Sequence, residues 1–155
     1  MPIRSQAKTK TPKLPLTEAE RTQLRRAKLL LTEVGSQHPE HLSAQLGTSF
    51  ERARELIALA AFQSVPSIGP KLAEDLVLLG YYSLSELHGL KGADLIDALE
   101  GKYGCQIDPC VEDQLRCVIH HAENPGSDKQ WWDFTGERKA YREQHGYSPT
   151  RPKPR

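Results

Sequence analysis

The sequence predicts an all-α protein. Apolar residues recur at intervals of three and four along much of the 155-residue chain, as they do on the buried face of a helix. Residues that cap helices precede several of these stretches, and glycine or proline follows them. No stretch shows the sustained two-residue alternation of a strand. We therefore expect a core of about five or six helices and no sheet.

The chain divides into three regions. Residues 1–15 carry prolines and lysines but almost no apolar side chains, which predicts a disordered basic arm. Residues 16–126 are expected to form the helical domain. Residues 127–155 are expected to form an aromatic and basic tail, with its last residues disordered.

Capping residues locate the helices of the first half. Thr17 and Glu20 have the T-x-x-E spacing of a capping box, and apolar residues continue at helical spacing to Gly35. Thr48 and Glu51 form a second such box, for a helix that ends near residue 62.

Proline and glycine delimit the remaining helices. Pro39, Pro70 and Pro109 each suit the first turn of a helix, where a backbone N–H is not needed. The expected helices are residues 39–46, 70–79, 84–88, 92–102, 109–123 and 137–145.

The turn between the helices that meet near residue 66 is the most informative segment. Ile68 is expected to plug the space between them, and Gly69 allows a ligand to approach the backbone closely. The N–H groups at the start of the next helix point outward at the positive end of its dipole, where Lys71 reaches the same phosphate. The site, Pro66, Ser67, Ile68, Gly69 and Lys71, would hold a nucleic-acid backbone and read no bases.

This turn resembles the helix-hairpin-helix DNA-binding motif, whose usual core is P-G-I-G followed by a small residue four positions after the last glycine. The match to the motif is good at Pro66, Ile68, Gly69, Lys71 and Ala73. Ser67 stands where the motif usually has its first glycine. If the position requires a positive φ, Ser67 is strained.

A longer resemblance covers roughly residues 40–135. The turn, GYYSLSEL at 80–87, DPCVEDQLRC at 108–117 and KQWW at 129–132 follow one another as in a bacterial family named for a pathogenicity locus, also labelled mitomycin-resistance-like. The resemblance implies a small SAM-like helix-hairpin-helix protein that contacts DNA, with a role in DNA repair or DNA metabolism. A second, mainly structural unit would join helices 92–102 and 109–123, with Lys102 and the N–H groups near Gly104 facing a second phosphate.

Charge is unevenly distributed along the chain. The formal net charge is +1, but residues 1–28 carry +6, residues 29–128 carry −9 and residues 129–155 carry +4. An acidic middle would repel phosphates, so the basic ends are expected to fold beside the turn. Four residues would supply auxiliary contacts: Arg21, Arg25, Lys102 and Arg138. Basic ends that only keep the protein soluble are the alternative.

Several classes of protein are disfavoured. The longest apolar run, residues 56–62, is too short to span a membrane, and no apolar stretch follows the charged N-terminus as in a secretory signal. An odd count of three cysteines indicates reduced thiols, so we expect a cytoplasmic protein without a membrane partner.

Chemistry-bearing residues do not assemble into a catalytic or metal site. Cys110, Cys117 and His121 lie along one stripe of one helix, where they cannot close on a single ion, and no nucleophile has an evident base. Glu112 and Asp113 are expected to lie on a helix with their side chains exposed to solvent. We expect no metal, cofactor or small-molecule substrate, and no enzyme activity.

The two adjacent tryptophans leave two alternatives open. Trp131 and Trp132 suit an anchor that holds the tail on the domain, or a platform that stacks on single-stranded bases.

The predicted function is sequence-nonspecific binding of the DNA backbone. A protein–protein interaction adaptor, with a degenerate helix-hairpin-helix that does not bind DNA, is the alternative.

Overall fold

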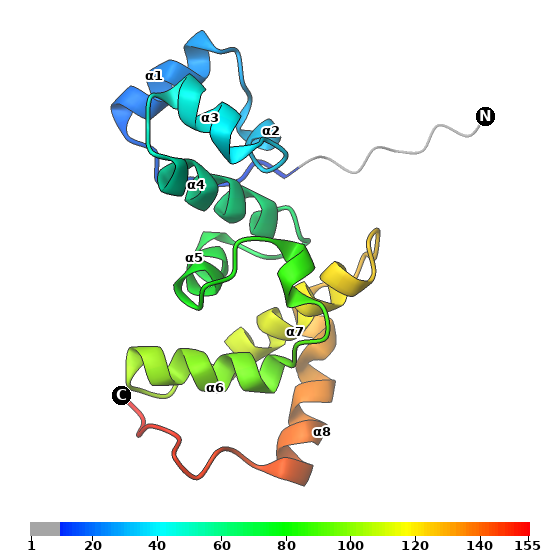
Figure 1. Cartoon of the computed structure of the whole chain (residues 1–155). Coiled ribbons are helices and arrows are strands. Elements are labelled where there is room, and N and C mark those ends of the chain that lie inside the picture. Colours follow the sequence, from blue (N-terminus) through cyan, green and yellow to red (C-terminus); the bar gives the residue numbers. More distant parts are fainter. Residues whose placement is uncertain (1–9) are drawn as a thin grey trace, which may run out of the picture.

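The computed structural model describes residues 10–155 as an all-α protein (Figure 1). These residues form eight α-helices and two 3-10 helices and no strand, which confirms the predicted all-α class. The elements are α1 (Glu18–Arg26), α2 (Leu31–Val34), α3 (Pro39–Leu46), α4 (Phe50–Gln63), α5 (Pro70–Leu78), η1 (Leu84–Leu87), α6 (Gly92–Tyr103), α7 (Pro109–Glu123), η2 (Trp131–Phe134) and α8 (Thr135–His145). None of the helices in residues 10–155 is long and apolar enough to cross a membrane.

The helices pack in a sequence of neighbours from one end of the molecule to the other. α1 packs on α3, α3 on α4, and α4 on α5, while α7 contacts α6, η1, η2 and α8 (Figure 1). A continuous cluster of buried apolar side chains connects these elements. The turn between α4 and α5 therefore lies near the middle of the molecule, fixed by helices on both sides.

The first predicted helix is interrupted. The capping box forms as predicted, since the Glu20 N–H donates to Thr17 Oγ1 at 3.1 Å and the Thr17 N–H to Glu20 Oε1 at 2.8 Å. Continuation to Gly35 is wrong, because Lys28 adopts a left-handed conformation with φ of 55°. The backbone there leaves the helical path and resumes it only in the short α2.

The predicted cap of α4 is displaced by one residue. The Ser49 hydroxyl, rather than that of Thr48, accepts a hydrogen bond from the Arg52 N–H at 3.1 Å. α4 consequently starts at Phe50, whose side chain is exposed. The buried face of the helix is formed instead by residues such as Leu56 and Phe62, which are fully buried.

Residues 10–15 are ordered against the domain, which differs from the predicted disordered arm. The Lys13 N–H donates to the Gln63 side-chain oxygen at 2.9 Å, and the Gln63 amide donates to the Lys13 carbonyl at 2.8 Å. Leu14 is buried in the core. The rest of the predicted arm, residues 1–9, lies outside the described residues.

The C-terminal tail is held on α6 and α7 by ion pairs. Arg138 contacts Asp113 at 2.6 Å, Arg142 contacts Glu112 at 2.8 Å, and Arg151 contacts Glu100 at 3.0 Å. All three carboxylates are buried. The expectation that Glu112 and Asp113 are solvated is wrong, because side chains from more than twenty positions later in the chain cover them. The basic tail thus neutralises part of the acidic middle from within the fold.

Candidate nucleic-acid interface

The turn between α4 and α5 places one residue in a left-handed conformation and the next in the core. Ser67 has φ of 63°, so the residue at this position, where the motif usually has glycine, does adopt a positive φ. The chain then reverses, and the Ile68 N–H donates to the Val65 carbonyl at 3.2 Å. The Ile68 side chain is fully buried, which confirms the predicted plug between the helices.

The start of α5 presents unpaired backbone donors beside an open surface. Gly69 is the N-cap, with φ of −100° and ψ of −176°, and Pro70 occupies the first turn. Within residues 10–155, the N–H groups of Gly69, Lys71 and Leu72 have no acceptor. A Cβ atom built on Gly69 would meet no atom within 4 Å. The fold itself therefore does not require glycine here, and the space above the backbone is free for a ligand.

Lys71 lies at this opening but is paired with a buried acid. Its side chain is 72% exposed, and its ammonium donates to Tyr103 Oη at 2.7 Å and lies 3.3 Å from Asp75 Oδ1. Tyr103 Oη in turn donates to Asp75 at 2.5 Å. The hydrogen bond to Tyr103, helped by the attraction of Asp75, raises the pKa of Lys71, so the side chain stays charged. A phosphate would have to compete with Asp75 for it.

A second ammonium group at the turn comes from Lys10. Its Nζ donates to the Ile68 carbonyl, and partial burial lowers the pKa of this side chain. The sequence did not identify Lys10, because residues in an irregular segment carry no periodicity that would place them beside a turn some sixty positions away. Lys10 and Lys71 therefore reach the same turn from distant parts of the chain.

The tail is attached to the turn through the Ser67 hydroxyl. The Ser67 hydroxyl oxygen accepts a hydrogen bond from the backbone N–H of Trp131 at 3.0 Å, and the hydroxyl donates to the Pro66 carbonyl at 2.6 Å. Trp131 packs against the core, which confirms the predicted anchor for this residue, and Phe134 is buried beside it. Trp132 differs, since it remains 55% exposed.

The strain at Ser67 can be measured with two variants that both lack the hydroxyl. Ser67→Gly and Ser67→Ala each lose the hydrogen bond to Trp131, but only alanine has a Cβ that disfavours φ of 63°. We expect the free energy of unfolding of the glycine variant, measured in urea, to exceed that of the alanine variant by about 1–2 kcal/mol. Equal stabilities would show that the turn does not hold a left-handed residue in solution.

The same turn occurs a second time, before α6. Gly89 has φ of 75°, the Leu90 N–H donates to the Leu87 carbonyl at 3.2 Å, and Lys91 is the extended N-cap of α6. The sequence signal was present, because L-H-G-L-K-G at 87–92 has the spacing of V-P-S-I-G-P at 65–70. The structure therefore places the second turn at residues 87–91.

Near Gly104, where a second phosphate contact is predicted, three N–H groups are already bonded. The Gly104 N–H donates to the Glu100 carbonyl at 2.8 Å, and the Ile107 N–H donates to Glu100 Oε2 at 2.8 Å. The Gln106 N–H is bonded to the Lys153 carbonyl at 3.1 Å. Three donors of the loop between α6 and α7 are thus used within the fold, and one of them, the Ile107 N–H, is bonded to the buried Glu100 carboxylate.

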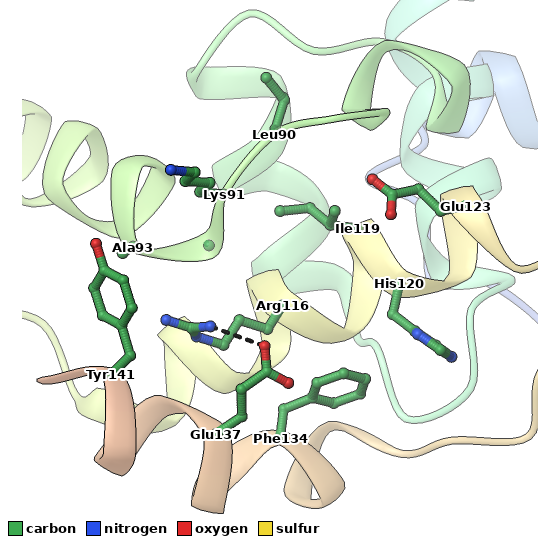
Figure 2. Close-up of a pocket in the computed structure, with 11 residues that line it drawn as sticks. Leu90, Lys91, Ala93, Arg116, Ile119, His120, Glu123, Phe134, Glu137 and Tyr141 are labelled. Carbon is green, nitrogen blue, oxygen red and sulfur yellow. Dashed lines mark hydrogen bonds and ion pairs between the residues drawn. The ribbon is translucent and has the colours of Figure 1, made fainter. Parts of the chain in front are cut away.

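A cavity of about 380 Å³ lies beside the second turn, between the start of α6, α7 and α8 (Figure 2). Arg116 lines it but is bonded to Glu137 at 3.2 Å and to Glu112 at 2.9 Å. Lys91 and Glu123 also line it, so both signs of charge are present. A Cβ on Gly92 would lie 2.5 Å from Arg116 Cγ, which shows how closely α6 and α7 approach. The cavity has no excess of positive charge with which to attract an anion.

The four predicted auxiliary residues are placed very differently. Arg21 and Arg25 are exposed on α1, which is separated from α5 by α3 and α4 (Figure 1). Lys102 is exposed and adjacent in sequence to Tyr103, which contacts Lys71. Arg138 is only 11% exposed and binds Asp113, so its charge is used inside the fold. Of the four, Lys102 alone is next in sequence to a residue that contacts Lys71.

The cysteine and histidine stripe of α7 holds the segment that leads to the tail. The Cys117 thiol donates to the Lys129 carbonyl at 3.8 Å, and His121 Nε2 lies 2.7 Å from the same oxygen. Burial raises the pKa of Cys117 to about 11, which keeps it a thiol. Residues 10–155 contain no group of three or more His, Cys, Asp or Glu side chains that could hold a metal ion.

Comparison with known proteins identifies the family of the chain. No solved structure matches the chain. The mitomycin resistance protein McrB of Streptomyces lavendulae is 25% identical over 73 residues, which cover 47% of this chain and 69% of that protein. A model of the family described as "Pathogenicity locus" matches residues 55–140, more than half of the sequence. The match includes both turns, η2 and the first half of α8, and the chain belongs to the pathogenicity-locus family.

Proposed function

We propose that this protein binds DNA without sequence preference, by holding the phosphate backbone in a helix-hairpin-helix formed by α4, residues 64–69 and α5. The observation that carries the proposal is the conformation of the turn. A left-handed Ser67 and a buried Ile68 orient unpaired N–H donors beside an open Gly69. Such donors at the positive end of a helix dipole bind phosphate and carry no base specificity.

The positions of the charges in the fold support the proposal better than the net charges of the sequence segments do. Three acidic residues of the middle segment, Glu100, Glu112 and Asp113, are buried and paired with arginines of the tail. Their charges do not face a phosphate approaching the turn. Lys10 contacts the turn through the Ile68 carbonyl, and Lys71 lies in the first turn of α5.

The second turn extends the proposed interface. Gly89 and Lys91 repeat the backbone geometry of the first turn at the start of α6. The Gly89 N–H is already bonded to Glu123 Oε1 at 2.9 Å, so Lys91 is the residue there that is free to attract a phosphate. We propose weak, salt-sensitive binding by a non-catalytic cytoplasmic protein of DNA repair or DNA metabolism.

Replacement of Lys71 by alanine tests the proposed contact. We expect affinity for a DNA duplex to fall about three- to tenfold, and the slope of log K against log salt to decrease by about one, because one phosphate contact is lost. Fluorescence anisotropy titrations at two salt concentrations measure both quantities. Lys139→Ala on α8, which removes an exposed lysine elsewhere, should change neither. Equal effects of the two variants would show that Lys71 is not at the interface.

An interaction adaptor that does not bind DNA is the second candidate. The observation that favours it is the pairing of Lys71 with Asp75, which reduces the positive charge at the turn. An adaptor would show no DNA binding even at low salt. It would instead bind a defined protein partner with an affinity that Lys71→Ala leaves unchanged.

A further inference from the structure

Trp132 is an exposed aromatic side chain held next to the turn. It is 55% exposed, whereas the neighbouring Trp131 packs against the core. The two indole rings meet edge to face with centroids 5.6 Å apart. The contact with Trp131 therefore leaves much of the Trp132 surface in solvent.

The position of Trp132 is fixed by contacts on both sides of η2. The Trp131 N–H is bonded to Ser67 Oγ at 3.0 Å, and the Gln130 N–H is bonded to Asp133 Oδ2 at 2.8 Å. Phe134 is buried and closes the short helix from the other end. Trp131 is the residue bonded to the turn, and the Cα atom of Trp132 lies about 3.8 Å from that of Trp131.

Ser67 accounts for this attachment. A glycine at that position would adopt φ of 63° without strain but would offer no hydroxyl to the Trp131 N–H. The serine thus departs from the usual hairpin pattern and supplies a hydroxyl that binds the backbone of the aromatic segment. Both features, the strained serine and the exposed indole, are explained if the tail presents Trp132 to the ligand of the turn.

We infer that Trp132 stacks on an unpaired base next to the phosphate bound at the start of α5, so that the preferred ligand is single-stranded DNA. This inference rests on the proposed backbone binding. Bases inside a duplex are stacked on one another and offer no free face, whereas the bases of a single strand do. Every base has such a face, so stacking adds affinity without sequence preference. Ser67 acts as a positioning residue for Trp132.

Two labelled probes of equal length test the inference. They are an oligothymidine of about 15 nucleotides and a blunt duplex of about 15 base pairs, titrated by anisotropy at the same low salt. We expect Trp132→Ala to weaken binding of the single strand at least fivefold and to change duplex affinity less than twofold. Trp132→Phe should keep most of the affinity, because phenylalanine also stacks. Phe50→Ala, which removes an exposed aromatic at the start of α4, should leave both affinities unchanged.

The outcomes separate this inference from the proposed function. If the wild-type protein binds both probes but Trp132→Ala affects neither, or weakens both equally, stacking is refuted and backbone binding stands. The first of these results is also the one expected if Trp132 contacts a protein partner instead. If the wild-type protein binds neither probe at low salt, both proposals fail.

Discussion

Glutamate in place of Gly69 is expected to reduce affinity for DNA at least tenfold at about 50 mM salt. The reason is local. The new side chain would project into the open space above the unpaired N–H groups. Its carboxylate would occupy the site proposed for a phosphate and would repel the phosphate. The fold should tolerate the change, since φ at this residue is −100° and no atom lies within 4 Å of the added Cβ.

Two controls isolate the cause of the loss. Gly69→Gln adds the same volume without the charge, and Gln144→Glu adds the same charge on the exposed face of α8. We expect the glutamine variant to bind less tightly than wild type but better than the glutamate variant, and Gln144→Glu to bind almost normally. Thermal unfolding of each variant checks that the fold persists. If Gly69→Glu bound DNA as well as Gln144→Glu does, the turn would not be the site.

Removal of the Arg138 side chain should lower the free energy of unfolding by about 3–5 kcal/mol. Arg138 Nε lies 2.6 Å from Asp113 Oδ1, and the Asp113 side chain is fully buried. In Arg138→Ala, the hydrogen bond from Thr135 Oγ1 at 2.8 Å is the one that the carboxylate would keep among residues 10–155. A buried charge without its partner is much more costly than the same pair intact. Urea unfolding followed by circular dichroism measures the change.

Neighbouring positions supply the comparison for Arg138. Lys139→Ala alters an exposed residue of the same helix and should change stability by less than about 0.5 kcal/mol. The double variant Asp113→Ala/Arg138→Ala removes both charges and should be more stable than Arg138→Ala alone. If Arg138→Ala were as stable as Lys139→Ala, the tail would not be docked on α7 as described.

Local signals in the sequence predicted the features that local physics determines. Thr17 with Glu20 located the start of α1, and the prolines at residues 39, 70 and 109 located the first turns of three helices. The conformational demand at Ser67 was also visible, because a serine stood at a position that usually holds glycine. Each of these depends on residues within a few positions of one another.

Contacts between distant segments could not be predicted in the same way. Arg151 and Glu100 are 51 positions apart, and Lys10 is 58 positions from Ile68. Sequence periodicity shows which face of a helix is polar, but it does not show that a tail will return and cover that face. The sequence pattern therefore predicts Glu112 and Asp113 in solvent and Arg138 at the interface, whereas in the structure Asp113 binds Arg138 and Glu112 binds Arg142.

The salt dependence of wild-type binding tests backbone recognition most directly. Affinity should be measured for two unrelated DNA sequences of equal length over a series of salt concentrations. We expect both to give the same affinity and a linear fall of log K against log salt, with a slope of about −2 to −4 for a few phosphate contacts. Affinity that differs strongly between the sequences, that does not depend on salt, or that is absent at low salt would contradict binding through the phosphate backbone.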